Sequence, residues 1–454
     1  MKYHVWTEGC QMNVADSQRL ESAFEKLGLE HTPRVADADV IVLNTCVVRQ
    51  SAEDRAYSYL QSLRPLKDKR PTVVIGVMGC LVGIKDNRRL KEKFSWVDVF
   101  APPSDPTPMI EFLRQREGLA LDQAEVAQRF AAQDYEIALP LHQRGQLVAA
   151  HVPVVLGCSH ACAFCIIPFR RGVERSRSVG EIMAEARSLV AQGVKEITLL
   201  GQIVDRYGYD LKSLSNFKFQ SETPLVDVLR LLNEMQGLER IRFLTSHPNW
   251  MTDELLDAVA ELPKVCEHIE VPVQAGDDEV LGRMKRGYTA DDYRRLVERI
   301  RRKLPGGSIA TDIIVGFPGE TEAQFLATCD LLAELRLDVA HIAKYSPRPQ
   351  TLAQRTMPDD VPPEEKERRR KAIEDLQERI VGEINARLLN QAVEMLVEDQ
   401  HKGKWRGRTR TNKLVFFEDE RDWRGKLANV TLPWTGPWSM QGVVNAADSQ
   451  RISG

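Results

Sequence analysis

The stretch GCSHACAFCIIPFRR (157–171) decides how the middle of the chain is interpreted. It contains Cys158, Cys162 and Cys165 in the spacing C-x3-C-x2-C. Thiolates this close together on one loop predict a metal site, and iron–sulfur clusters are held by cysteine thiolates, usually four of them. A cubane cluster on this loop would have three protein ligands. One iron would then stay open to a ligand that is not protein, which makes the loop a candidate site of chemistry.

Three other uses of these cysteines fit less well. A structural zinc site needs four tetrahedral ligands, and His160 could be the fourth, but the crowded spacing suits tetrahedral geometry poorly. Disulfides belong to oxidising compartments, of which the sequence gives no sign. Three inert buried cysteines at this spacing would be unusual. We therefore favour a cluster.

Composition sets wide bounds on the class of protein. The chain has 454 residues, a net charge of −3 and 28% charged residues, which is ordinary for a globular protein of several domains. The N-terminus MKYHVWTEGC lacks the apolar core of a signal peptide, and no apolar run reaches the roughly 18 residues that a membrane span needs. Reduced cysteines without a targeting signal predict a cytoplasmic protein. We expect no membrane contact, and a monomer.

The first hundred residues alternate apolar runs with helical patterns, which is typical of a parallel sheet covered by helices. The runs are 3–7, 39–45, 72–78 and 96–100, and the clearest helical patterns are 16–27 and 52–63. Cys10, Cys46 and Cys80 each follow one of the first three runs. Ligands of open α/β sheets gather outside the carboxyl ends of the strands. We therefore expect these cysteines to converge on a second three-thiolate site, although free cysteines are also common packing residues.

A second β/α region follows a connector. Residues 101–143 begin with the proline-dense APPSDPTP and include a helical piece at 109–116. Six β/α units then follow, too few for a complete eight-stranded barrel, so we expect an open, partial barrel with its site at the C-terminal strand ends. The cysteine loop follows the first of these strands. The predicted strands are 152–156, 196–200, 240–245, 268–273, 309–316 and 339–346.

The last part of the chain changes character. Acidic residues after Pro362 and Pro363 begin a long amphipathic helix, and short β-type runs then predict a small β-barrel. The segment HKGKWRGRTRTNK (401–413) combines cations with one aromatic residue and has no acid. This composition suits RNA, although a solvated β-hairpin is the alternative. The candidate RNA contacts are Lys402, Lys404, Trp405, Arg406, Arg408, Arg410 and Lys413.

Together these features resemble a known family. The cysteine loop at the head of a six-unit barrel resembles the radical S-adenosylmethionine (SAM) enzymes, and the whole layout resembles their methylthiotransferase branch. The resemblance implies an N-terminal methylthiotransferase domain at 1–117, a radical SAM core at 144–380 and an RNA-binding β-barrel of the TRAM type at 383–447. GCQMNVADSQRLE (9–21), NTCVVRQSAEDR (44–55) and GRTRTNKLVFFE (407–418) are similar to the branch acting on tRNA that already carries an isopentenyl group.

The resemblance also implies cofactors and a reaction. One 4Fe–4S cluster would lie on Cys158, Cys162 and Cys165, and an auxiliary one on Cys10, Cys46 and Cys80. SAM would bind the open iron and supply a radical. The expected reaction is methylthiolation of C2 of the N6-(dimethylallyl)adenosine next to the anticodon, with a reducing electron donor and a sulfur source as partners. The alternatives are threonylcarbamoyl-adenosine tRNA, a ribosomal-protein aspartate, or a non-catalytic RNA-binding redox sensor.

Some individual residues follow from the resemblance. Those expected near SAM are Phe164, Gly201, Gln202, Ser246, Gln274, Gly316 and Glu320, for which ordinary turn and strand-end roles are the alternative. A basic run could meet the SAM carboxylate, RNA phosphate or only solvent: Arg170, Arg171, Arg175 and Arg177. Cys266 and Cys329 match neither trio and are expected to be packing residues. The sequence singles out no catalytic acid or base.

Overall fold

The computed structural model describes residues 1–48, 50–85, 88–115, 139–211 and 217–445. The chain divides into two compact units, which we describe separately. Unit 1 consists of Met1–Gly145, Ala150–His160 and Cys165–Gln192, and unit 2 of Gln146–Ala149, Ala161–Phe164 and Gly193–Gly454. Among the helices of the described ranges, none has the length and apolar character needed to cross a bilayer.

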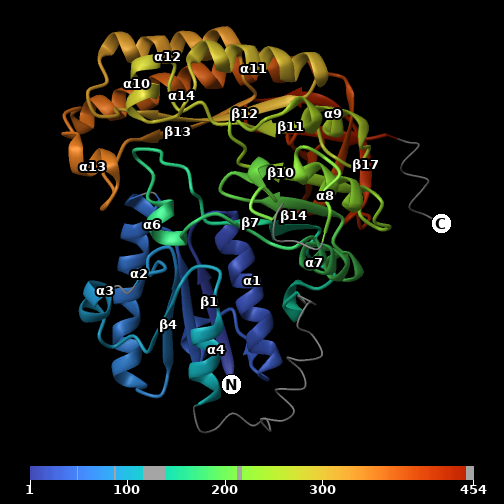
Figure 1. Cartoon of the computed structure of the whole chain (residues 1–454). Helices are drawn as coiled ribbons and strands as arrows, with labels where there is room; N and C mark the ends of the chain where they lie inside the picture. The colour runs from blue at the N-terminus through green and yellow to red at the C-terminus, as the bar shows by residue number, and fades with distance from the viewer. Residues whose placement is uncertain (49, 86–87, 116–138, 212–216, 446–454) are drawn as a thin grey trace. The chain divides into compact units, whose positions relative to one another are not determined.

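Unit 1 is built on a five-stranded parallel sheet in the order β2-β1-β3-β4-β5 (Figure 1). The four predicted strands are confirmed, and a two-residue strand that the pattern did not predict, β2, is added at one edge. The bounds are β1 (Lys2–Thr7), β2 (Glu30–His31), β3 (Val40–Thr45), β4 (Val74–Gly79) and β5 (Val99–Ala101). Every residue of β3 and β4 is buried, because helices cover both faces of the sheet.

Two apolar clusters hold the helices of unit 1 to the sheet. On one face, Leu20 and Phe24 of α1 (Gln11–Lys26) and Met109 of α4 (Thr107–Arg114) pack against the strands. On the other face, α2 (Gln50–Lys69) and α3 (Arg88–Lys93) do the same. The predicted helix at 109–116 thus starts two residues earlier. Residues 116–138 of the predicted connector lie outside the described residues.

The remainder of unit 1 consists of short strands and helices and one longer helix. Its elements are the short helix η1 (Val35–Asp37), η2 (Leu141–Gln143), β6 (Ala149–Pro153), whose first residue belongs to unit 2, β7 (Val155–Leu156), α6 (Ile167–Arg171), β8 (Arg175–Ser176) and α7 (Val179–Ala191). Ser178 and Glu181 form a capping box that starts α7. A helix is therefore present where the first of the predicted β/α units expects one.

Unit 2 contains the last five of the six predicted core strands in the expected order, while the first, predicted at 152–156, corresponds to β6 and β7 of unit 1. The five are β9 (Glu196–Leu200), β10 (Arg240–Leu244), β11 (His268–Glu270), β12 (Ser308–Val315) and β13 (Val339–Lys344). The pairs β9/β10, β11/β12 and β12/β13 are parallel. Val148, just before β6, accepts hydrogen bonds from the N–H groups of Lys195 and Glu196, where β9 begins. The predicted α/β class is confirmed.

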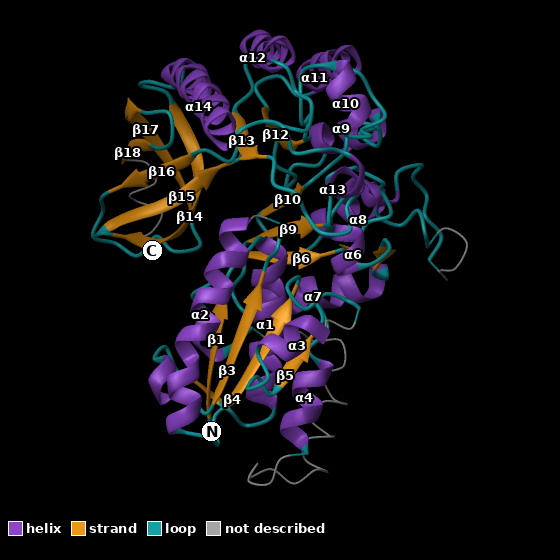
Figure 2. Cartoon of the chain, turned by 90° about the vertical axis from the view of Figure 1, so that its left-hand side faces the viewer, coloured by secondary structure: helices purple, strands orange, loops and turns teal. Residues whose placement is uncertain are grey.

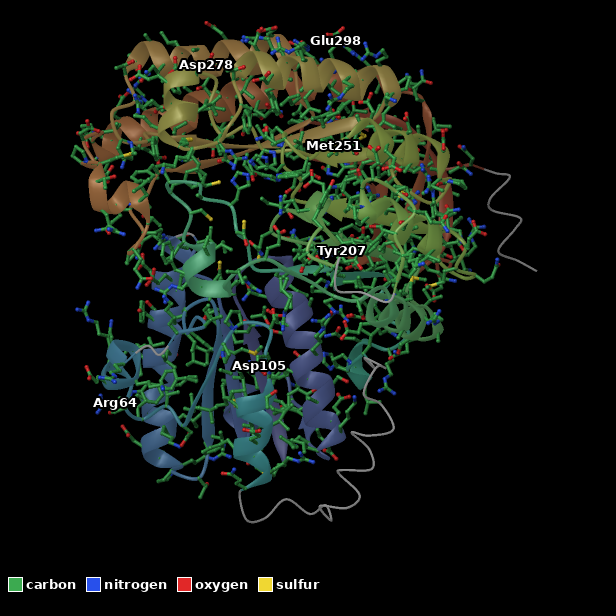
Figure 3. The ribbon with its side chains drawn as sticks, viewed as in Figure 1. Arg64, Asp105, Tyr207, Met251, Asp278 and Glu298 are labelled. Carbon is green, nitrogen blue, oxygen red and sulfur yellow. The ribbon has the colours of Figure 1, made fainter. Side chains whose placement is uncertain are left out.

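Helices follow these strands as the pattern predicts, and α11, α12 and α14 form a layer over β12 and β13 (Figure 1). Asp278 lies on α10 and Glu298 on α11, in the helical part of unit 2 (Figure 3). Tyr207 and Met251, which the same figure labels, are buried. The bounds are η3 (Val204–Arg206), α8 (Pro224–Asn233), α9 (Asp253–Glu261), α10 (Asp278–Arg283), α11 (Ala290–Lys303), α12 (Glu322–Leu335), α13 (Leu352–Thr356) and α14 (Pro363–Ala386).

The chain then forms a closed five-stranded barrel in the order β14-β15-β16-β18-β17 (Figure 2). Its strands are β14 (Ala392–His401), β15 (Lys404–Thr409), β16 (Leu414–Phe417), β17 (Leu427–Thr435) and β18 (Met440–Val444). The predicted small barrel is confirmed. Its core includes Trp405, Phe417 and Trp423. The strand β15 lies inside the basic segment, which the sequence did not predict to be a barrel strand.

Candidate functional site

The first three cysteines converge at one edge of the unit 1 sheet. Cys10 is the N-cap of α1 just after β1, and Cys46 and Cys80 directly follow β3 and β4. These strands are neighbours, so their carboxyl ends lie side by side. A β-carbon on Gly9 would come within 2.8 Å of Cys46 Cβ, which shows how closely the first loop approaches the second. The expected convergence of the three loops is therefore seen.

Two buried asparagines fix this edge, and sequence reasoning missed both. Asn13 Nδ2 donates to Asn44 Oδ1 at 2.9 Å and to the Thr45 carbonyl at 3.2 Å. Asn44 Nδ2 donates in return to the Asn13 carbonyl at 2.8 Å. Both residues are fully buried, and buried amides must be paired to be tolerated. Their position close to Cys10 and Cys46 in sequence is the signal that could have identified them.

Cys80 is the most deeply set thiol of this trio. Burial raises the pKa of its thiol to about 12, and the guanidinium of Arg171 acts in the opposite direction. Cys46 is also buried and accepts from the Val48 N–H at 3.4 Å, whereas Cys10 is exposed. A thiol must lose its proton to bind iron. The edge therefore offers three free thiols, one with a cationic donor beside it.

The basic run after the cysteine loop is not uniformly solvated. Arg171 is buried, and its Nε donates to Cys80 Sγ at 3.2 Å. Arg177 donates to Glu185 at 2.5 Å and to the Pro153 carbonyl at 2.8 Å. Arg170 approaches Gly83, and Arg175 is exposed. For Arg171 and Arg177 the solvated-loop alternative is therefore wrong.

The second trio lies on a loop whose residues fall in both units. In unit 1, the Cys158 N–H donates to the Gly172 carbonyl at 3.0 Å, and Cys158 Sγ accepts from the His160 N–H at 3.4 Å. In unit 2, Cys162 Sγ accepts from Arg286 Nη1 at 3.1 Å. Arg286 is another buried cation that sequence reasoning missed. Cys165 comes directly before the segment that forms α6.

Within the described ranges, no three His, Cys, Asp or Glu side chains are arranged to hold a single metal ion. A cubane cluster places its irons at separate corners, so its ligands stand further apart than those of one ion. The cysteine thiols of the two trios, of which Cys80 and Cys162 accept hydrogen bonds from arginine, have the donor chemistry that such a cluster uses.

The residues expected near SAM that follow β10 and β11 have unusual local structure. Ser246 is buried, and its Oγ has no hydrogen-bond partner among the described residues. Thr245, which donates to the Gly201 carbonyl at 2.6 Å, has a φ of 64°, and Gln274 has a φ of 81°. Left-handed backbone at residues other than glycine is strained, and such strain clusters at functional sites. An unpaired buried hydroxyl beside it suits a polar ligand.

Two expected residues are committed to the fold itself. Glu320 accepts from the Gly316 N–H at 2.6 Å and from Arg369 Nη1 at 2.8 Å. Burial raises the pKa of the Glu320 carboxyl, and these two donors oppose that effect. The carboxylate therefore shapes the turn after β12. For Glu320 the structural alternative accounts for every contact seen.

The remaining expected residues are placed without special geometry. Phe164 is half-buried, with its ring 6.4 Å from that of Phe317, and Gln202 is half-buried after β9. Cys266 is buried and Cys329 is half-buried on α12. Both positions agree with the packing role expected for these two cysteines.

A pair of carboxylates inside the core strands was not expected. Glu270 ends β11, and Asp312 lies on the adjacent β12. Burial and the charge of Asp312 raise the pKa of Glu270 to about 7. Glu270 also accepts the Ser246 N–H through its carbonyl at 3.0 Å. An acid that titrates near neutrality thus lies beside the strained strand ends.

The basic segment divides into an outward and an inward set, because side chains alternate along β15. Lys404, Arg406 and Arg408 face outward, next to Glu418, Asp399 and Glu398 respectively. Trp405 is buried in the barrel core and donates from Nε1 to the Asp419 carbonyl at 3.1 Å. In this conformation Trp405 cannot stack on a base.

The tip of the same hairpin docks on the core strands of unit 2. Arg410 makes an ion pair with Glu267 at 2.6 Å, and Lys413 with Asp338 at 2.9 Å. Arg242 Nη1 and Nη2 donate to the carbonyls of Arg410 and Thr409, both at 2.7 Å. Arg410 and Lys413 therefore join the barrel to the core, and the exposed Lys402 stands at the opposite hairpin turn.

One row of cross-strand pairs on the barrel surface contains two aromatic residues, which the sequence did not reveal. Arg406 pairs with Phe416, Phe416 with Gln441, and Gln441 with Trp434 across four strands. Directly paired residues point to the same side of a sheet. The side chain of Trp434 is 49% exposed. The row thus presents two aromatic rings outward.

Comparisons with known proteins agree with this architecture. Residues 152–332 match the Radical SAM superfamily, and residues 2–102 match Uncharacterized protein family UPF0004. The chain is 48% identical to the tRNA-2-methylthio-N(6)-dimethylallyladenosine synthase of Roseiflexus sp. (strain RS-1), covering 100% of this chain and 92% of the relative. It is 45% identical to the synthase of the same name from Dehalococcoides mccartyi (strain CBDB1), covering 98% and 99%.

A solved structure shares the fold. The radical S-adenosylmethionine methyltransferase TsrM from Kitasatospora setae aligns with a TM-score of 0.55 at 16% identity, covering 78% of this chain and 77% of that one. Identity this low supports the fold alone, whereas the full-length relatives settle the family. The chain belongs to the radical SAM superfamily and, within it, to the family of tRNA-2-methylthio-N(6)-dimethylallyladenosine synthases.

Proposed function

We propose that this protein transfers a methylthio group to C2 of N6-(dimethylallyl)adenosine next to the anticodon of tRNA. The observation that carries the proposal is the convergence of Cys10, Cys46 and Cys80 at one sheet edge, in a chain that has a second trio on its radical SAM loop. The full-length relatives carry the name of this reaction. Two thiolate trios suit a reaction that needs both a radical and a sulfur carrier.

The two trios would hold two clusters with different roles. Cys158, Cys162 and Cys165 would hold a 4Fe–4S cluster with an iron open to SAM, and Cys10, Cys46 and Cys80 an auxiliary 4Fe–4S cluster. When bound and reduced, the first centre supplies an organic radical able to abstract hydrogen from C2. The unpaired Ser246 Oγ and the strained Gln274 would meet polar atoms of SAM. Glu270, with its pKa raised to about 7, is placed to exchange a proton near these strand ends.

The barrel would bind the RNA by stacking more than by charge. Each outward cation of β15 already has an acidic neighbour, so this face carries little excess positive charge. The half-buried Phe416 and the exposed Trp434 offer ring faces to unpaired bases, and stacking tolerates any base. Single-stranded loops expose such bases, so an anticodon loop suits this surface better than a duplex.

Nucleoside analysis tests the proposed reaction. The gene is expressed in a bacterial host deleted for its own methylthiotransferase of this kind, and the tRNA is digested and analysed by mass spectrometry. We expect 2-methylthio-N6-(dimethylallyl)adenosine to reappear with the native chain and not with Cys158→Ala. The unmodified precursor in both strains would refute the tRNA assignment. Methylthio-threonylcarbamoyl-adenosine or a methylthiolated ribosomal protein would identify the other substrates.

A further inference from the structure

Arg171 is a buried cation that faces a proposed cluster ligand. Its side chain is only 3% exposed, and it lies at the end of α6, six residues after Cys165. Its Nε donates to Cys80 Sγ at 3.2 Å, and its Nη1 donates to Ser104 Oγ at 3.1 Å. All of these residues belong to unit 1. A residue of the radical SAM loop region thus contacts the sulfur of the other trio.

The positive charge of Arg171 is paired with the carboxylate of Asp16, but the contact is long. The carboxylate of Asp16 is fully buried and accepts from Nη1 and Nη2 at 3.4 Å each, which is long for a charge-assisted bond. A buried charge is costly unless it is well paired. The contact of 3.2 Å from Nε to Cys80 Sγ is shorter than both contacts to Asp16. The guanidinium therefore ties the position of the Cys80 sulfur to that of α6.

The residue after Arg171 holds the other cysteine loop. The Gly172 carbonyl accepts the N–H of Cys158 at 3.0 Å. A β-carbon on Gly157, whose φ is 72°, would lie 2.2 Å from the Val173 carbonyl oxygen, so the two segments are in tight contact. Arg171 and Gly172 thus connect Cys80 to Cys158 through one side chain and one peptide group.

The second trio has a comparable arginine, which provides an internal control. Arg286 Nη1 donates to Cys162 Sγ at 3.1 Å, while its Nε donates to Tyr288 at 2.8 Å. This arginine belongs to unit 2 and is also buried. Each trio therefore contains a cysteine whose sulfur accepts a hydrogen bond from a buried guanidinium.

We propose that Arg171 is a positioning residue of the auxiliary cluster, which orients Cys80 and raises the reduction potential of that cluster. The inference rests on the proposed function, because it assumes a cluster on Cys10, Cys46 and Cys80. Hydrogen bonds to ligand sulfur and nearby positive charge favour the more reduced, more negative state of a cluster. Removing the guanidinium should therefore shift the potential to a more negative value.

The test isolates the auxiliary cluster. Cys158, Cys162 and Cys165 are replaced by alanine, the protein is reconstituted anaerobically, and the midpoint potential is measured by a redox titration followed by electron paramagnetic resonance. We expect Arg171→Gln to have a more negative midpoint potential than the parent, with Arg171→Lys between them. Arg286→Gln in the same background should leave the potential unchanged. An unchanged potential in Arg171→Gln at full iron content would overturn the inference.

Iron and sulfide content distinguishes the remaining outcomes. If Arg171→Gln holds no cluster, Arg171→Lys should restore it, because the ammonium can donate to the same sulfur. A folded Arg171→Lys variant without a cluster, judged by circular dichroism, would also overturn the inference. If the triple-alanine parent itself binds no iron, the auxiliary site of the proposed function fails, whatever Arg171 does.

Discussion

Buried polar side chains decide the local structure around both cysteine trios. Asn13 and Asn44 lock the start of α1 to the end of β3, and each satisfies the other without water. Arg171 and Arg286 bring positive charge to a thiol in a buried setting. In each case a residue that would be costly alone is stabilised by partners that the fold brings together.

Among single residues, Glu270 makes the clearest pH-dependent contribution to the stability of the folded state. The folded pKa of this carboxyl is raised to about 7 from an ordinary 4.5, so the folded state holds its proton more tightly than the unfolded state. Stability therefore falls as the pH rises from about 4.5 to 7, and the loss is complete above 7. Glu270→Gln has no carboxyl to titrate, so the variant does not lose stability in this way as the pH rises. We expect the variant to be more stable at pH 8 by at most about 3 kcal/mol.

Anaerobic thermal unfolding at several pH values measures the effect. The Tm difference between Glu270→Gln and the native protein should be largest at pH 8 and shrink as the pH approaches 5. Glu298→Gln, on the exposed side of α11, is the matched control and should give no such trend. A Tm difference that does not change with pH would contradict the raised pKa.

Sequence patterns predicted the positions of the cysteines better than the side chains that contact them. Cys10, Cys46 and Cys80 could be placed because strand ends are visible in the hydrophobic pattern. The contact between Arg171 and Cys80 could not be predicted in this way. It depends on how α6 packs, and no local sequence pattern encodes that packing. Glu320 and Trp405 show the same limit, since the family resemblance marked Glu320 and composition marked Trp405 as functional, and packing commits both to the fold.

At the scale of elements, β15 shows why a barrel strand was not recognised inside the basic segment. The composition of KWRGRT is dominated by cations, but its alternation has the period of two that is typical of a half-buried strand. The pattern is short and contains a glycine. A β-carbon on Gly407 would lie 2.0 Å from the Leu396 carbonyl oxygen, so this glycine lets β14 and β15 approach closely.

The outward row of the barrel can be tested by its effect on RNA affinity. We expect Phe416→Ala and Trp434→Ala each to weaken binding of a tRNA anticodon stem-loop by about 1–3 kcal/mol, because each ring would stack on a base. Arg406→Ala should cost less, since Asp399 already compensates its charge. Arg295→Ala, an exposed arginine on α11, is the control and should bind as the native protein does.

Fluorescence anisotropy at two salt concentrations gives these affinities. The stacking account predicts a weak dependence of Kd on salt, because few phosphates are neutralised. A steep dependence, with Arg406→Ala costing more than the aromatic variants, would show that charge dominates instead.

At the scale of the whole molecule, the chain combines two α/β regions with a small closed barrel. The pattern of strands and helices predicted both α/β regions and the barrel, because long periodic segments are the strongest local signal. It did not predict that the hairpin tip at Arg410 and Lys413 ties the barrel to the core strands within unit 2. That attachment depends on Glu267 and Asp338, more than 70 residues away in sequence.

In the proposed reaction, the trio at Cys158, Cys162 and Cys165 starts the chemistry while the trio at Cys10, Cys46 and Cys80 delivers the sulfur. The most direct test is one anaerobic reaction of reconstituted Cys46→Ala with SAM, a reductant and RNA containing N6-(dimethylallyl)adenosine, with 5′-deoxyadenosine and methylthiolated RNA both quantified. Cys329→Ala serves as the control and should form both products. We predict that Cys46→Ala still releases 5′-deoxyadenosine and forms no methylthiolated RNA, whereas full methylthiolation by this variant would contradict the division of work between the two trios.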